Sequence, residues 1–320
     1  MNLSVLSCPD CKGDLHEINQ KIFCKNCNKE QGFIEEGIPV FHGSKDHVGF
    51  FDKQATQRLA EKYAQFTYDT FIETLKKTKL YEMDFWNKKV GIAEKFWWEK
   101  YLGKITNKDI LEVGCGINYI VPYWLHTGNK VAAFDICAES VHLLDLVLKK
   151  TGLDKNSPFL FVADAERLSA RKQYDLININ NVLHHIKDKQ RVLLNLRELL
   201  KDNGRLLIVE PNYYYPFRWI IETDFMESIN FVKSWFVKHD LIEKGEKAVI
   251  FSQLKKMISD AGYTIEFNTK DSNYLGYGIT YFFKENSILP RIIYNIDHWI
   301  LSYILPGKIA PFEYLILKKN

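Results

Sequence analysis

The sequence predicts an α/β protein, a doubly wound and mostly parallel sheet with a cysteine-rich module at its N-terminus and a helical insertion. Three observations predict this fold class. Four of the six cysteines cluster before residue 28. From residue 109 onward, short apolar strands alternate with helical stretches, which is typical of a parallel sheet covered on both faces. An aromatic-rich segment, 211–248, interrupts the alternation after the fifth strand.

Composition excludes several classes of protein. The 320 residues are 46% hydrophobic and 26% charged, which suits a large globular domain with an appendage and excludes collagen-like or disordered chains. The formal net charge of +3 is too small to indicate a dedicated nucleic-acid binder. Because Met1–Asp10 lacks a leader pattern and no run of about 18 apolar residues occurs, we expect a cytoplasmic protein without a membrane span.

The chain divides into three expected regions. Residues 1–48 form the cysteine-rich module, 49–103 a helical connector or cap, and 104–320 the sheet domain. Within the sheet domain, 211–248 is expected to form a lid and 286–310 an amphipathic helix. That helix is expected to pack on its own domain, and docking on a membrane surface is the alternative.

Seven strands and four main helices are expected in the sheet domain. The strands are Ile110–Val113, Lys130–Asp135, Phe159–Ala163, Tyr174–Ile179, Arg205–Glu210, Tyr263–Asn268 and Phe312–Leu317. The helices lie near 118–127, 138–150, 188–201 and 252–261. The third helix is expected to close at Asn203-Gly204 through a left-handed residue.

The four clustered cysteines predict a metal site. Cys8 and Cys11 form one Cys-x2-Cys pair and Cys24 and Cys27 form a second, so two tight turns can direct four thiolates at one ion. Four thiolates suit a structural, tetrahedral Zn²⁺ and leave no open position for catalysis. Redox cysteines or a chance arrangement are the alternatives.

A glycine-containing turn follows the first strand of the sheet domain. The stretch Ile110–Asn118 runs from an apolar strand that contains Glu112 through Gly114 and Gly116 into a helix. Glycines here let the backbone pass close beneath a ligand, at the edge where open α/β sheets bind cofactors. The sequence therefore predicts a cofactor site at this turn.

Polar residues end the neighbouring strands. Asp135 ends the second strand, where its carboxylate can accept both hydrogens of ribose hydroxyls. Asp164 and Ala165 follow the third strand, placed for an adenine amino group. The fourth strand, Tyr174–Ile179, leads into polar residues at the same edge.

These four elements in this order resemble the class I S-adenosylmethionine-dependent methyltransferases, over roughly residues 95–212. The resemblance implies a Rossmann-like sheet with an antiparallel final strand and S-adenosylmethionine as cofactor. Such families often carry a third glycine where this chain has Asn118. The resemblance implies a cofactor-binding set of Glu112, Gly114 and Gly116 at the methionine part, Asp135 and Ile136 near the ribose, Asp164 and Ala165 at the adenine, and Asn180 beside the sulfonium.

The cysteine-rich module has a resemblance of its own. Leu6 through Cys27, followed by Gly37–Phe41, is similar to zinc ribbons of small proteins that activate tRNA and rRNA methyltransferases, and to ribbons fused to single-chain methyltransferases.

A nicotinamide dinucleotide is the alternative cofactor of the sheet domain. Its Gly-x-Gly-x-x-Gly pattern would need a glycine at Tyr119, which favours adenosylmethionine.

Methyl transfer from a sulfonium is a direct displacement, so the enzyme aligns the reactants, excludes water and, for some acceptors, removes a proton. His184 and His185 follow the fourth strand, where a structural role is favoured; if one of them is a base, we expect His185. Glu210, which closes the fifth strand, is expected to orient the acceptor or to tie down a loop.

The aromatic, weakly charged lid favours an apolar or sugar-like acceptor over a polyanion. The expected function is O-methylation of a small-molecule, glycan or lipid-linked acceptor. The lid begins with Tyr213–Tyr215 and Trp219. A base methyltransferase of rRNA or tRNA is the first alternative, and an inactive methyltransferase fold that serves as a binding partner is the second. If the acceptor is lipid-linked, we expect peripheral membrane contact through residues 286–310. The sequence does not indicate the oligomeric state.

Overall fold

The structure is a computed structural model that describes residues 3–42, 98–116, 120–215, 249–270 and 309–320, with isolated positions between 292 and 305. Nearly all of the expected connector and of the expected lid and amphipathic helix lies outside these ranges. In the described residues, no helix is long and apolar enough to cross a membrane.

The N-terminal module, residues 3–42, is a set of antiparallel hairpins. Its elements are η1 (Leu3–Val5), β1 (Leu15–Ile18), β2 (Lys21–Cys24), β3 (Glu30–Glu35) and β4 (Ile38–Phe41). The two-residue turns Asn19-Gln20 and Glu36-Gly37 have positive φ at both positions, as short hairpin connections require. Turn chemistry therefore sets the register of these short strands.

The sheet domain adds seven strands. They are β5 (Asp109–Val113), β6 (Lys130–Asp135), β7 (Phe159–Val162), β8 (Tyr174–Asn180), β9 (Leu200–Pro211), β10 (Tyr263–Lys270) and β11 (Phe312–Lys319). The strand order across the described sheet is β1-β2-β3-β4-β7-β6-β5-β8-β9-β11-β10. Strands β5 to β9 pair in parallel, and β11 runs antiparallel to β9 and β10, which confirms the expected final strand.

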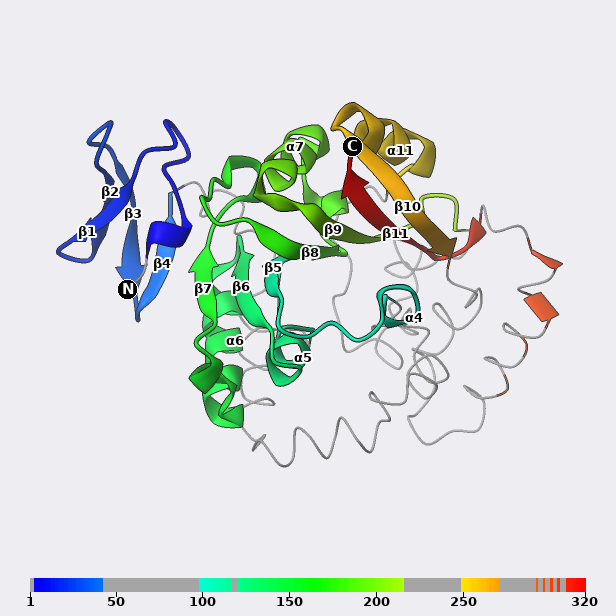
Figure 1. The fold of residues 1–320 in the computed structure, drawn as a ribbon, viewed down its shortest axis with the longest axis horizontal. Coiled ribbons are helices and arrows are strands. Elements are labelled where there is room, and N and C mark those ends of the chain that lie inside the picture. Colours follow the sequence, from blue (N-terminus) through cyan, green and yellow to red (C-terminus); the bar gives the residue numbers. More distant parts are fainter. Residues whose placement is uncertain are drawn as a thin grey trace, which may run out of the picture.

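Helices cover both faces of this sheet (Figure 1). They are α4 (Glu99–Leu102), α5 (Ile120–His126), α6 (Ala138–Thr151), α7 (Lys189–Leu199) and α11 (Phe251–Asp260). One buried cluster joins α5 and α6 to Ile110 of β5, and the other joins α7 and α11 to Leu111 and Val113 of the same strand. The expected doubly wound α/β fold is confirmed. The chain runs from β5 outward through β6 and β7, then crosses to β8 on the other side of β5, so a topological switch point lies beside β5.

The expected C-terminus of α7 is wrong. The helix ends at Leu199, and Leu200 is already extended with φ −85° and ψ 134°. Leu200 pairs with Tyr174, so the ladder with β8 begins before Asn203-Gly204, which lies inside β9. Strand pairing therefore overrides a local sequence that is typical of a helix end.

The N-terminal module extends the sheet beyond β7. Val40 of β4 pairs in parallel with Val162 of β7, and Leu6 forms an antiparallel bridge with Ala170. Phe41 belongs to the same buried cluster as α7. The module is thus packed on the body of the protein at the edge of its sheet (Figure 1).

Candidate functional site

The carboxyl ends of the parallel strands meet at one edge of the sheet, next to the switch point. The registers of β5 with β6 and β8, and of β6 with β7, place these ends side by side. This arrangement brings together five residues that the sequence assigned to the cofactor: Gly114, Gly116, Asp135, Asp164 and Asn180. In open α/β sheets this edge is where ligands bind.

Asp135 connects the end of β6 to the turn after β5. Its side chain is almost buried, and its two oxygens accept hydrogen bonds from Gly116 N (2.8 Å) and Cys137 N (2.9 Å). Burial raises the pKa of Asp135, although hydrogen bonds from backbone N–H groups and the electrostatic interaction with His185 oppose the rise. His185 is therefore within electrostatic range of the Asp135 carboxylate.

The two glycines of the turn have different surroundings. Gly114 has φ +65°, and a Cβ there would lie 2.3 Å from Cγ2 of Val182, so the turn after β5 packs tightly on the segment after β8. Gly116 has φ +44°, and a Cβ there would meet no atom of the described residues within 4 Å. Among the described residues, this leaves room beside the Asp135 carboxylate for the close approach of a bound cofactor to the backbone.

Glu112 lies beneath this turn and has no exposed surface. Its carboxylate accepts hydrogen bonds from Nδ2 of Asn178 (2.9 and 3.0 Å) and from Nε1 of Trp124 (3.1 Å). Burial raises the pKa of Glu112 to about 8, although both donors oppose the rise. Glu112 therefore differs from the residues at the sheet edge: it lies in the interior and joins β5 to β8 and α5.

The residues expected near the adenine begin a short 3-10 helix, η3 (Ala165–Arg167). Asp164 caps this helix, with Oδ1 accepting a hydrogen bond from Glu166 N at 2.8 Å. Ala165 is buried, and its carbonyl accepts a hydrogen bond from Asn195 of α7 at 3.2 Å. The conformation of η3 therefore sets the direction of the Asp164 side chain.

Two further expected residues lie at the ends of their strands. Ile136 follows β6 and is half-buried. Asn180 ends β8 and is half-buried; its Oδ1 accepts a hydrogen bond from Nδ2 of Asn181 at 3.0 Å. Asn181 has φ +57°, which turns the chain sharply away from the strand.

Glu210, at the end of β9, holds the segment that follows β8. It is fully buried and accepts hydrogen bonds from the backbone N–H groups of Val182 (2.9 Å), Leu183 (2.7 Å) and His184 (3.3 Å). Nδ1 of His184 also lies 2.8 Å from its carboxylate. These contacts support the loop-tying role for Glu210.

The sequence prediction missed the contact between Glu210 and His184. The signal was present, because Glu210 lies at the carboxyl end of β9 and His184 follows the carboxyl end of its neighbour β8. This contact lies between the His184 ring and the same carboxylate that binds the backbone of its segment, so Glu210 holds both the backbone and the side chain of His184. His185 is exposed, and its ring centroid lies 3.9 Å from that of His184.

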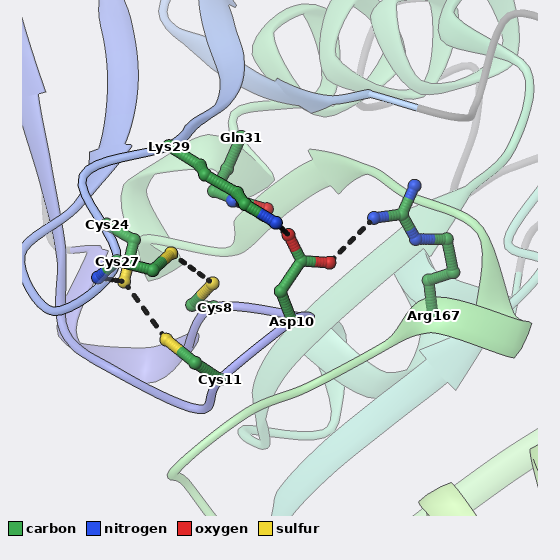
Figure 2. A network of polar contacts seen from close by, with 8 residues as sticks. All are labelled: Cys8, Asp10, Cys11, Cys24, Cys27, Lys29, Gln31 and Arg167. Carbon is green, nitrogen blue, oxygen red and sulfur yellow. Dashed lines mark hydrogen bonds and ion pairs between the residues drawn. The ribbon is translucent and has the colours of Figure 1, made fainter.

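The four cysteines of the N-terminal module form one cluster (Figure 2). Their sulfur atoms all lie within 4.8 Å of one another, with Cys8 Sγ 3.9 Å from Cys27 Sγ and Cys11 Sγ 3.4 Å from Cys24 Sγ. A tetrahedral zinc with Zn–S bonds of about 2.3 Å needs sulfur atoms about 3.8 Å apart. The cluster therefore fits a four-thiolate metal site.

Comparison with known proteins relates part of the sheet domain to methyltransferases. Residues 111–206 match a family model described as a methyltransferase domain. A ubiquinone biosynthesis O-methyltransferase of Rickettsia conorii is 29% identical over 110 residues, which are 34% of this chain and 37% of that protein. The Rickettsia prowazekii protein with the same description is 32% identical over 108 residues, 34% of this chain and 42% of that protein. The matches thus span about two fifths of the length of these relatives.

Solved structures agree on the fold. An S-adenosylmethionine-dependent methyltransferase from Clostridium acetobutylicum has a TM-score of 0.50 and 16% identity, covering 79% of this chain and 99% of that chain. The [4+2]-cyclase SpnF also has a TM-score of 0.50 and 16% identity, covering 72% and 84%. The chain therefore has the Rossmann-like fold of methyltransferases, and its segment 111–206 matches a methyltransferase-domain model, while the fold alone does not define the reaction.

The raised pKa of Glu112 predicts an unusual dependence of stability on pH. In the unfolded chain the carboxyl ionises near pH 4.5, whereas in the folded protein it ionises near pH 8. Unfolding therefore releases a proton between these values, and the free energy of unfolding falls as pH rises, by at most about 1.4 kcal/mol per pH unit from this group. We expect Glu112→Gln to lack this contribution, so its stability relative to the unsubstituted protein improves between about pH 5 and pH 8.

Denaturant unfolding at several pH values measures this difference. Asp175→Asn is the matched control on β8. Asp175 is partly buried, yet the Asp109 N–H and Lys201 keep its pKa below the usual value. Its substitution should therefore shift stability equally across the same range. Parallel stability curves for Glu112→Gln and the unsubstituted protein would contradict the prediction.

Proposed function

We propose that the protein is an S-adenosylmethionine-dependent methyltransferase that transfers the methyl group to an oxygen of a small-molecule, glycan or lipid-linked acceptor. The observation that carries the proposal is the methyltransferase-domain match over residues 111–206. That segment supplies the polar residues and glycines that lie together at one edge of the sheet, and relatives described as O-methyltransferases support an oxygen acceptor.

The residues at this edge suit the parts of the proposed cofactor, which supplies an electrophilic methyl group when bound. Asp135 is proposed to accept hydrogen bonds from the ribose hydroxyls, using lone pairs that its two backbone donors leave available. Asp164 and the backbone of Ala165 are proposed to contact the adenine. Gly114 and Gly116 are proposed to let the methionine part lie against the backbone.

Three other residues have supporting positions in the proposal. Asn180 is proposed to line the floor beside the sulfonium, and Ile136 to pack next to the ribose. Glu112, buried against Asn178 and Trp124, is proposed to hold the turn from below. We also propose that the cysteine cluster holds a structural Zn²⁺, which its donor set and its sulfur spacing support.

An oxygen acceptor with a hydroxyl group needs a proton acceptor at neutral pH. We propose His185 for this role, because it is exposed at the edge that carries Asp135. The contact between Glu210 and His184 is proposed to hold the segment so that His185 faces the acceptor.

The aromatic residues after β9 bear on the acceptor. Tyr213 and Tyr214 are 48% and 56% exposed, and their rings pack edge to face with centroids 5.4 Å apart. Exposed tyrosines at the edge of a site favour an aromatic or otherwise largely apolar acceptor. This supports a small-molecule or lipid-linked acceptor over a polyanion.

The Gly116→Ala variant tests the cofactor site. The new Cβ would enter the open space above the backbone, where the cofactor is proposed to lie. We expect the variant to fold, with a stability loss of about 1–2 kcal/mol from its positive φ, and to bind S-adenosylhomocysteine at least tenfold more weakly in calorimetry. Unchanged affinity would contradict the proposed placement of the cofactor.

The class of acceptor is tested by incubating the protein with methyl-labelled S-adenosylmethionine and fractionated cell extract. We expect label in small molecules or lipids, and not in RNA. Label in RNA would favour a base methyltransferase and overturn the proposed acceptor. Absence of S-adenosylhomocysteine binding and of label transfer would instead indicate a methyltransferase fold that serves as a binding protein.

The role of His185 is tested once an acceptor is known. Loss of a general base typically lowers turnover by about 10²–10⁴-fold, so we expect His185→Gln to lower kcat by at least 100-fold while cofactor affinity changes little. Lys187→Gln, a nearby exposed substitution, serves as control. Full turnover by His185→Gln would remove His185 from the mechanism.

A further inference from the structure

The N-terminal module is joined to residues 164–172, the segment that follows β7. The backbone N–H of Ser7 donates to the carbonyl of Ser169 at 3.1 Å, and the two serine hydroxyls are 2.7 Å apart. The backbone N–H of Arg171 donates to the carbonyl of Val5 at 3.0 Å. The stretch that leads into the first cysteine pair therefore runs directly against this segment.

A single carboxylate extends this connection to η3 (Figure 2). Asp10 lies inside the turn between Cys8 and Cys11, and its Oδ1 accepts a hydrogen bond from Nη2 of Arg167 at 3.2 Å. Its Oδ2 lies 3.4 Å from Nε2 of Gln31 and 3.5 Å from Nζ of Lys29. Asp10 thus links the first metal-binding turn to β3 on one side and to η3 on the other.

The helix η3 contacts the proposed active site in two places, at the residue proposed to bind the adenine and at the loop that follows the histidines. It begins after Asp164, which caps it. Its Glu166 accepts hydrogen bonds from the backbone N–H groups of Lys187 and Asp188, each at 3.1 Å, two and three residues after the proposed base His185. A shift of η3 would therefore move the adenine side of the site and would disturb the loop that follows the histidines.

The position of Asp10 depends on the cysteine cluster. The module consists of four short strands, and small modules of this kind need the free energy of metal binding to fold. Asp10 lies between two of the proposed ligands, so occupancy of the cluster fixes the backbone that carries its carboxylate. A crevice between the module and η3 is lined by Pro9, Asp164 and Arg167 among others.

We propose that the N-terminal module is an intramolecular brace for the cofactor site, with Asp10 and Arg167 as positioning residues. Metal binding at the cysteine cluster and cofactor binding at the sheet edge are then coupled through η3. The inference rests on the proposed function, because it takes the site beside Asp164 to bind the adenosyl cofactor. Coupling between two sites is reciprocal, so each ligand raises the affinity for the other by the same factor.

Binding measurements on the full chain test the brace without any assay of activity. We expect S-adenosylhomocysteine to bind the Zn²⁺-loaded protein at least about fivefold more tightly than the Zn²⁺-depleted protein. In competition with a chelator, saturating S-adenosylhomocysteine should raise Zn²⁺ affinity by the same factor. Equal affinities in both experiments would overturn the proposal.

The two proposals fail in distinguishable ways. If neither form of the protein binds S-adenosylhomocysteine, the proposed function is rejected. Hydrogen exchange of residues 164–172 then still reports on the brace. Removal of Zn²⁺ should increase exchange in this segment, and unchanged exchange would overturn the brace independently of any cofactor.

Substitutions assign the coupling to the Asp10–Arg167 contact. We expect Asp10→Asn and Arg167→Gln each to lower the coupling factor toward one, and the double variant to lower it no further, because both remove the same contact. Exposed ion pairs contribute little to stability, so these variants should remain folded. Asp10 lies between two proposed metal ligands, so Asp10→Asn could itself change metal binding. Arg167 lies outside the module, so Arg167→Gln removes the same contact without altering the metal-binding turn.

Lys21→Gln is the matched control. Lys21 lies at the start of β2, and the substitution removes its ion pair with Glu30 (2.8 Å), whose carboxylate is 33% exposed, as is that of Asp10. We expect this variant to keep the full coupling factor. An equal loss of coupling in Lys21→Gln would show general weakening of the module and would overturn the assignment to Asp10 and Arg167.

Discussion

The hydrogen bond from the Gly116 N–H to the Asp135 carboxylate determines the geometry on which the rest of the site depends. It joins the turn after β5 to the end of β6 at 2.8 Å. Strand β5 lies between β6 and β8 in the sheet. The hydrogen bond that fixes the turn after β5 against β6 therefore also fixes how far this turn lies from the segment that follows β8. A nearly buried carboxylate needs such donors, so the contact satisfies Asp135 and orders the glycine turn at the same time.

The acidic residues at the strand ends divide into two kinds. Glu112 and Glu210 are fully buried, and their contacts hold neighbouring segments of the protein. Asp135 and Asp164 lie nearer the surface, and each uses backbone N–H groups to fix its own direction. The sheet edge is thus organised as a supporting layer of buried carboxylates beneath a layer that can contact a ligand.

Local patterns made much of the fold predictable from the sequence. The bounds of β6 agree with the prediction because Lys130–Asp135 is a short apolar run that ends in a carboxylate. The cysteine cluster was predictable because each pair lies on one tight turn. The end of α7 was not, since pairing of Leu200 with β8 depends on residues far away in the chain.

Long-range contacts account for what the sequence could not predict in the site. Glu112 and Asn178 are 66 residues apart, and Asp10 and Arg167 are 157 residues apart. Each pairing depends on strand order and register, which spacing along the chain does not contain. The residue types at the sheet edge could be predicted, but not the partner that each side chain selects.

The pairing of Val40 with Val162 has a consequence for the outer rim of the sheet. Strand β7 would otherwise be a border strand, with N–H and C=O groups available to a strand of another molecule. Strand β4 pairs with β7 at this one position, and its hairpin continues the described sheet outward through β3, β2 and β1. The outermost strand on this side of the described sheet is therefore the four-residue β1, and a short edge strand offers few backbone groups to a strand of another molecule.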